Sequence, residues 1–140
     1  MKLYKLGYTT GVFDMFHVGH LNILRRAKEF CDKLIVGVST DELVESYKHK
    51  SPIMPLEDRL EIVSAIKYVD KVVIQSDRNK FLAWEKIHFN ALFVGDDWKG
   101  SKLFNELEQK FKLVNVDIVF FPRTEGISTT ILTEIIRRKK

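Results

Sequence analysis

The segment LYKLGYTTGVFDMFHVGHLNILRRAKEFCDKLIVGV, residues 3–38, contains the unit from which the fold is built. Its beginning at residues 3–10 predicts a strand, and apolar residues at helical spacing predict a helix over residues 19–31. The apolar run at residues 34–38 then predicts a buried strand. A strand, a helix and a second strand in this order predict a right-handed crossover between two parallel strands.

The same alternation continues along the chain. Ser39 and Glu42 match a capping box that would begin a short helix, and Pro55 is expected to begin another. Further strands are predicted at residues 72–74, 91–94 and 116–121, and further helices at residues 81–87, 103–111 and 128–138. We therefore expect one domain over residues 1–140, with an α/β fold: a Rossmann-like, doubly wound, mostly parallel five-stranded sheet with helices on both faces. Such sheets bind ligands beyond the carboxyl ends of their strands, so the loops after the first, fourth and fifth strands form the candidate site.

Composition restricts the partners. The 140 residues include one cysteine, Cys31, and carry a formal net charge of +4. No apolar run is long enough for a membrane-spanning helix or a secretory signal, and one cysteine cannot form an intrachain disulfide. We expect a cytoplasmic protein. Its modest positive charge suits an anionic small molecule and would also suit weak contact with nucleic acid or anionic lipid. Of these we expect the small molecule, with no nucleic-acid or membrane partner.

Two histidines stand between the first predicted strand and the first predicted helix. His17 and His20 are one helical turn apart at a helix N-terminus, where backbone N–H groups attract anions. Three interpretations arise: packing histidines with capping roles, half of a metal site, or a pair of donors to a polyphosphate. No metal site is expected, because Cys31 has no partner motif and only His49 and His88 remain among the histidines. From these residues alone, the other two interpretations stay equally open.

Two distant motifs together resemble a known family. His17-Val18-Gly19-His20 matches the H-x-G-H signature of the nucleotidyltransferase superfamily, which class I aminoacyl-tRNA synthetases share. The segment RTEGISTT at residues 123–130 resembles the signature of the cytidylyltransferase branch, and GDDW at residues 95–98 also resembles that branch. Two motifs at this separation are far more specific than H-x-G-H alone. The resemblance extends over residues 8–136 and is strongest to cytidylyltransferases that act on glycerol 3-phosphate.

The resemblance implies a reaction and a set of roles. The phosphate of an alcohol phosphate, glycerol 3-phosphate first of all, attacks the α-phosphorus of CTP, pyrophosphate leaves and a CDP-alcohol forms. Mg²⁺ is expected to enter with CTP, and a homodimer is implied. The implied catalytic residues are His17, His20, Lys50 and Arg123. The implied nucleotide-binding residues are Val12, Phe13, His17, His20, Lys50, Asp96, Arg123, Thr124, Gly126, Ile127, Ser128, Thr129 and Thr130. The implied acceptor-binding residues are Asp14, Lys48 and Trp98.

The chemistry of this reaction favours such residues. A phosphate monoester has a second pKa of roughly 6, so it needs no strong base to act as a nucleophile. The difficulty is electrostatic, because two anions must meet and charge must build on phosphoryl oxygens. Positioned cations and N–H donors from separate segments supply what that transition state requires.

Alternatives remain for individual residues and for the function. The structural interpretations are a solvated loop over residues 47–54 for Lys48 and Lys50, bonds to backbone amides for Asp14, turn formation for Asp96 and Asp97, core packing for Trp98, and N-capping for Ser128, Thr129 and Thr130. For Arg59, a role in the site, a role in the dimer interface and a surface ion pair all stay open. Val12 replaces the threonine usual in glycerol-3-phosphate enzymes, so choline phosphate and ethanolamine phosphate stay open as acceptors. An adenylyltransferase of the same fold is a further alternative. A non-catalytic protein that binds nucleotides or nucleic acid is the alternative from another class.

Overall fold

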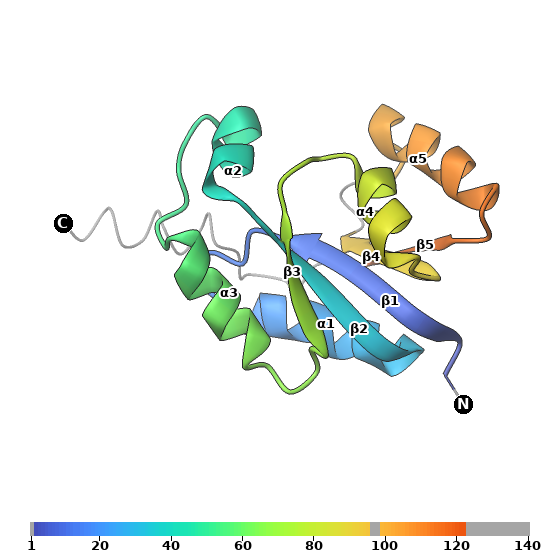
Figure 1. The fold of residues 1–140 in the computed structure, drawn as a ribbon, viewed down its shortest axis with the longest axis horizontal. Coiled ribbons are helices and arrows are strands. Elements are labelled where there is room, and N and C mark those ends of the chain that lie inside the picture. The colour runs from blue at the N-terminus through green and yellow to red at the C-terminus, as the bar shows by residue number, and fades with distance from the viewer. Residues whose placement is uncertain (1, 96–98, 123–140) are drawn as a thin grey trace.

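Five parallel strands form one sheet in the order β3-β2-β1-β4-β5, which confirms the expected α/β fold. Figure 1 shows this computed structural model, which describes residues 2–95 and 99–122. The strands are β1 (Tyr4–Gly11), β2 (Cys31–Ser39), β3 (Lys71–Gln75), β4 (Ala91–Gly95) and β5 (Asp117–Phe121). The helices are α1 (Val18–Phe30), α2 (Asp41–Lys48), α3 (Leu56–Ser64), α4 (Lys80–Ile87) and α5 (Lys102–Lys112). The helix predicted at residues 128–138 lies outside the described residues.

Each face of the sheet has its own apolar core. On one face, side chains of α1 and α3 pack against β1, β2 and β4, with Leu24, Val36 and Phe93 fully buried. On the other face, α4 and α5 pack around Tyr8, Leu92 and Phe111. Both faces of β4 are buried, with Ala91 and Phe93 in one core and Leu92 and Val94 in the other, so this central strand is a continuous apolar run.

The start predicted for α2 was one residue too early. Ser39 was expected to cap this helix, but it is buried as the last residue of β2 and pairs with Gln75 of β3. Thr40 caps the helix instead, because its side chain accepts a hydrogen bond from the Leu43 N–H at 3.0 Å. A residue that still pairs within the sheet is not available as a helix cap, so the cap moves to the first residue beyond the strand.

The strand and helix boundaries differ elsewhere in a similar way. Cys31 was expected to end α1, but it caps that helix and is already the first residue of β2. Cys31 and Leu34 are buried, whereas Asp32 and Lys33 between them are exposed. The apolar run that predicted this strand therefore marked only its buried centre.

A buried polar contact fixes the end of β3 to the middle of the sheet. The Tyr8 hydroxyl donates to Gln75 Oε1 at 2.5 Å, and both residues are buried. Gly37 makes room for that hydroxyl, because a Cβ at position 37 would overlap the Tyr8 oxygen. The side chain of Gln75 also donates to the Asp77 carbonyl, so the segment after β3 is held to the sheet.

The topology determines where the candidate site lies. The strand order reverses at β1, since β2 and β3 lie on one side of it and β4 and β5 on the other. Such a reversal leaves a crevice beyond the carboxyl ends of the two central strands. The segment from Gly11 to His17 leaves β1 at this edge and leads directly into α1.

Candidate functional site

His17 and His20 form a reciprocal cap at the start of α1. His17 is the N-cap residue, and its Nδ1 accepts a hydrogen bond from the Gly19 N–H at 3.0 Å. The His17 N–H in turn donates to Nδ1 of His20 at 3.2 Å. The two rings stack with their centroids 4.0 Å apart. The capping role considered from sequence is therefore confirmed, and it uses one nitrogen of each ring.

This cap determines which nitrogen of each imidazole carries the proton. A ring nitrogen that accepts a backbone N–H cannot itself be protonated, so the neutral ring carries its proton on Nε2. Burial lowers the pKa of His17 below its usual value. Burial, the His17 ring and the charge of Lys48 lower the pKa of His20 to about 4, against the opposing effect of Asp14. Both side chains are consequently neutral N–H donors near pH 7, and a capping role does not compete with binding an anion.

The loop before α1 is held in shape by Asp14, which is buried. Its carboxylate accepts hydrogen bonds from the N–H groups of Ile53 at 2.8 Å and Met54 at 2.9 Å. The structural interpretation of Asp14 is therefore confirmed: it binds backbone amides of the α2–α3 segment. Since that segment contains Lys50, Asp14 joins the histidine loop to the lysine loop.

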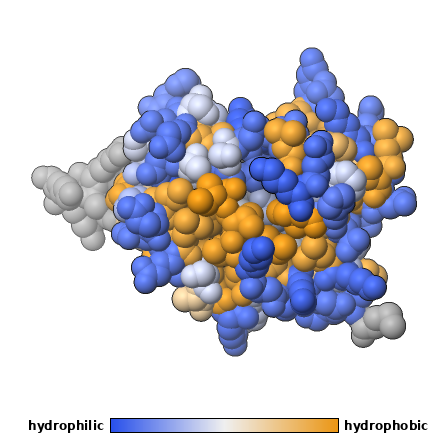
Figure 2. All heavy atoms as spheres, viewed as in Figure 1, coloured by the Kyte–Doolittle hydropathy of each residue, from blue (hydrophilic) through white to orange (hydrophobic). Residues whose placement is uncertain are grey.

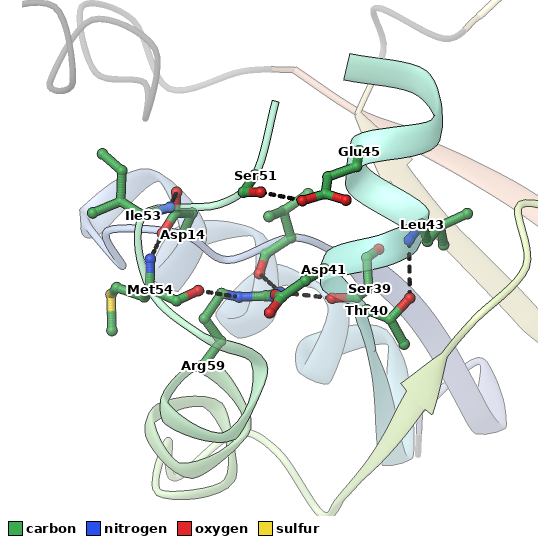
Figure 3. Close-up of polar contacts among 11 residues, drawn as sticks. Asp14, Ser39, Thr40, Asp41, Leu43, Glu45, Ser51, Ile53, Met54 and Arg59 are labelled. Carbon is green, nitrogen blue, oxygen red and sulfur yellow. Dashed lines mark hydrogen bonds and ion pairs between the residues drawn. The ribbon is translucent and has the colours of Figure 1, made fainter. Parts of the chain in front are cut away.

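Arg59 of α3 makes a second connection between these loops, a role that was not among those considered for it from the sequence. A surface ion pair was one interpretation, but the Arg59 side chain is completely buried. It donates to the carbonyls of Val12 at 2.9 Å, Ser39 at 2.7 Å and Met54 at 3.0 Å, and it pairs with Asp41 (Figure 3). These contacts fasten the loops that follow β1 and β2 to the start of α3. A signal was present, because Arg59 lies in register with Leu56 and Val63 on the apolar stripe of its helix.

Lys48 and Lys50 lie on either side of the end of α2. Lys48 is the last residue of that helix, so the expectation of a loop over residues 47–54 was wrong for its first two positions. Burial and the neighbouring charge of Lys50 lower the pKa of Lys48, whereas Asp14 raises it. Because Lys48 also acts on His20, the charge of Lys48 belongs to the same local environment as the histidine pair.

The remaining first-loop residues have clear structural surroundings. Phe13 is buried with a φ of 56°, and its ring contacts the edge of the His20 ring at a centroid distance of 5.5 Å. Val12 contributes its backbone carbonyl to Arg59. The other predicted site residues lie outside the described residues: Asp96, Asp97, Trp98, Arg123, Thr124, Gly126, Ile127, Ser128, Thr129 and Thr130. Within the described ranges, no three His, Cys, Asp or Glu side chains are grouped so that they could bind a metal ion.

We predict that both imidazoles stay neutral and protonated on Nε2 across the neutral pH range. Long-range ¹H–¹⁵N NMR of the histidine rings should show an unprotonated Nδ1 for His17 and His20, with His20 titrating near pH 4. Since the unfolded chain takes up this proton at about pH 6.5, the free energy of unfolding should fall as the pH drops below that value. A protonated Nδ1 on either ring at pH 7 would contradict the cap described above. Exposed His49 provides a comparison in the same spectra.

We also predict that Arg59→Met is strongly destabilising. The substitution removes the hydrogen bonds that Arg59 donates to three backbone carbonyls and its ion pair with Asp41, so the free energy of unfolding should fall by about 2 kcal/mol or more. Denaturant unfolding measures this change. Arg25→Met is a matched control on the exposed face of α1, and it should change stability by no more than about 0.5 kcal/mol. Equal effects of the two substitutions would show that Arg59 does not fasten the loops.

Comparison with known proteins places the chain in a family. The family model described as cytidylyltransferase-like matches residues 8–135. The chain is 38% identical over 123 residues to the glycerol-3-phosphate cytidylyltransferase of Staphylococcus aureus (strain NCTC 8325 / PS 47), covering 87% of each chain. It is 55% identical over 115 residues to an FAD synthase of Pyrococcus horikoshii, covering 80% of this chain and 76% of that one.

Solved structures support the fold. A protein described as the lipopolysaccharide core biosynthesis protein from Thermoplasma volcanium GSS1 superposes with a TM-score of 0.73 at 24% identity, over 89% of this chain and 99% of that chain. No helix among the described residues has both the length and the apolar character needed to cross a membrane. With the family model matching nearly the whole sequence, and with the H-x-G-H histidines at the carboxyl edge of a parallel sheet, the chain belongs to the cytidylyltransferase-like family of nucleotidyltransferases.

Proposed function

We propose that this enzyme transfers CMP from CTP to the phosphate of an alcohol phosphate, with glycerol 3-phosphate as the first candidate acceptor. The observation that carries the proposal is the pair of Nε2–H donors that the reciprocal cap fixes at the start of α1. The RTEGISTT motif at residues 123–130 supports CTP as the nucleotide. Relatives named glycerol-3-phosphate cytidylyltransferase, which cover most of the chain, support the acceptor.

The proposed reaction is a single displacement at phosphorus. An oxygen of the acceptor phosphate forms a bond to the α-phosphorus of CTP, the bond from that phosphorus to the bridging oxygen breaks, and pyrophosphate leaves. His17 and His20 donate N–H groups to phosphoryl oxygens whose negative charge grows in the transition state. Because these imidazoles are neutral, positive charge comes from other side chains, for which Lys48, Lys50 and Arg123 are proposed. No residue needs to act as a general base, since the acceptor is already an anion.

Magnesium is proposed to arrive with the nucleotide. The described residues offer no cluster of metal ligands, and the Asp14 carboxylate nearest the histidines is engaged with two backbone amides. Oxygen atoms of the triphosphate are the ligands that Mg²⁺ prefers, with water completing its coordination. The ion would neutralise charge on the phosphates, while the chain itself holds and orients them.

A second candidate acceptor comes from the FAD synthase relatives. FAD consists of AMP joined to FMN through a bond between two phosphates, and FMN is itself a phosphate monoester. The chemistry is therefore the same, with ATP in place of CTP and a larger acceptor. The 55% identity to the Pyrococcus horikoshii relative favours this alternative.

The experiment crosses two nucleotides with four acceptors. Pyrophosphate release is measured with CTP or ATP and with glycerol 3-phosphate, choline phosphate, ethanolamine phosphate or FMN, all with Mg²⁺. We expect CTP with glycerol 3-phosphate to give the highest kcat/KM, and His17→Ala to reduce kcat by about 100-fold or more. His88→Asn is the matched control, because His88 is exposed at the end of α4 with a φ of 58° that asparagine tolerates.

Two outcomes would contradict the proposal. Release of pyrophosphate with ATP and FMN alone would establish the second candidate in place of the first. If no combination releases pyrophosphate, the enzyme does not transfer a nucleotide to any of these acceptors.

We also propose that the enzyme is a homodimer. Figure 2 shows apolar atoms gathered where β2 and β3 cross the view in Figure 1 with no described helix in front of them. Ile74 of β3 and Leu82 of α4 are 57% and 44% exposed. A contiguous apolar surface of this kind favours association. Sedimentation should give twice the monomer mass of 16.4 kDa, and a monomer at micromolar concentration would contradict the proposal.

A further inference from the structure

Two cations from different elements lie against one tyrosine ring at the end of the sheet. The Arg78 guanidinium, in the segment between β3 and α4, lies 4.9 Å from the centroid of the Tyr47 ring. The Lys48 ammonium lies 6.0 Å from the same centroid. Tyr47 and Lys48 are the last two residues of α2. The segment that follows β3 therefore brings a positive charge to the ring that Lys48 also lies beside, and Lys48 in turn acts on His20.

Lys80 extends this group of charges. It is the first residue of α4, and its side chain is only partly exposed. Burial and the charge of Arg78 lower its pKa to about 8, while Asp77 opposes the shift. Across residues 2–95 and 99–122, the ion pairs are Lys28 with Asp70 and Arg59 with Asp41, so neither Arg78 nor Lys80 has an ion-pair partner there. We call Lys50, Lys48, Arg78 and Lys80 the cation row.

The segment that carries Arg78 is held in place. The Thr40 N–H donates to the Gln75 carbonyl at 3.1 Å, which ties the end of β3 to the start of α2. The Asp77 carboxylate accepts from the Asn79 N–H at 2.8 Å, and the Asn79 side chain caps α4 through the Phe81 N–H at 3.0 Å. Asp77 is thus engaged with the backbone of its own turn. The fold therefore holds the backbone that carries Arg78 and Lys80 beside the end of α2.

Burial is the main cause of the lowered pKa values of Lys48 and Lys80, and repulsion adds to it, from Lys50 at Lys48 and from Arg78 at Lys80. A bound anion relieves that repulsion, and guanidinium and ammonium groups both form strong charge-assisted hydrogen bonds to phosphate. The row begins beside the histidine pair, where the nucleotide phosphates are proposed to bind, and runs away from it toward α4. A dianionic phosphate monoester in this row would lie next to the reacting nucleotide.

We propose that Arg78 and Lys80, together with Lys48, bind the phosphate of the acceptor and so determine which acceptors the enzyme uses. This inference rests on the proposed function, which places the nucleotide at His17 and His20. It assigns the two anionic substrates to two adjacent groups of residues: the histidine N–H donors for the nucleotide, and Lys48, Arg78 and Lys80 of the cation row for the acceptor. Arg78 and Lys80 are then specificity residues that bind the acceptor.

The kinetic test separates the two substrates. Arg78→Gln combined with Lys80→Gln should raise the KM for the acceptor at least about tenfold, because charge-assisted hydrogen bonds to its phosphate are lost. The KM for the nucleotide should change less than about twofold. Arg78→Lys should retain part of the affinity. Lys86→Gln, which removes one exposed charge from the last turn of α4, is the matched control and should leave both constants unchanged. An unchanged acceptor KM, or an equal rise for both substrates, overturns the proposal.

A binding measurement keeps this test independent of turnover. Titration calorimetry with inorganic phosphate should show binding by the full chain that the double variant weakens at least about fivefold and Lys86→Gln leaves intact. If phosphate binds the double variant as well as the unaltered chain, the cation row does not hold a phosphate. If the unaltered chain binds phosphate but transfers no nucleotide to any acceptor, and the double variant loses phosphate binding, the cation row is supported and the proposed function is refuted.

Discussion

The reciprocal hydrogen bonds between His17, His20 and the first turn of α1 are the constraint on which the site depends. Each ring uses Nδ1 to accept a backbone N–H, so the backbone fixes both the orientation and the tautomer of each imidazole. A donor that is already oriented needs no reorganisation when charge develops on a ligand, which is the main source of electrostatic stabilisation in enzymes. The cap and the proposed phosphate contacts are therefore two consequences of one arrangement.

Neutral histidines leave the supply of positive charge to other residues, and two buried side chains hold the loop that carries one of them, Lys50. Asp14 binds the backbone just beyond Lys50, and Arg59 joins the loops that follow β1 and β2 to the start of α3. Charged groups are costly to bury unless their hydrogen-bonding capacity is satisfied, and in the described residues no buried side-chain nitrogen or oxygen lacks a partner. Both residues act through backbone groups, and they orient loops that would otherwise move separately.

The sequence predicted the class of fold better than it predicted the ends of individual helices and the contacts of individual side chains. The alternation of apolar strands and amphipathic helices was enough for the doubly wound sheet, because burial on both faces leaves a strong hydrophobic pattern. The cap of α2 was misplaced at Ser39 because the pairing of that residue with Gln75 is a tertiary contact. The burial of Arg59 was also missed, although its place on the apolar stripe of α3 indicates it, because the carbonyls that satisfy its guanidinium come from separate segments of the chain. The proximity of Arg78 to Tyr47 depends on how two separate segments meet, and no local pattern contains that information.

The most direct test of the histidine arrangement is a crystal structure of the chain with a non-hydrolysable analogue of the nucleotide that it uses. We predict that Nε2 of both His17 and His20 lies about 2.7–3.2 Å from a phosphate oxygen, while each Nδ1 keeps its backbone donor. A triphosphate bound out of reach of both imidazoles, or a ring turned so that Nδ1 meets the phosphate, would contradict this prediction.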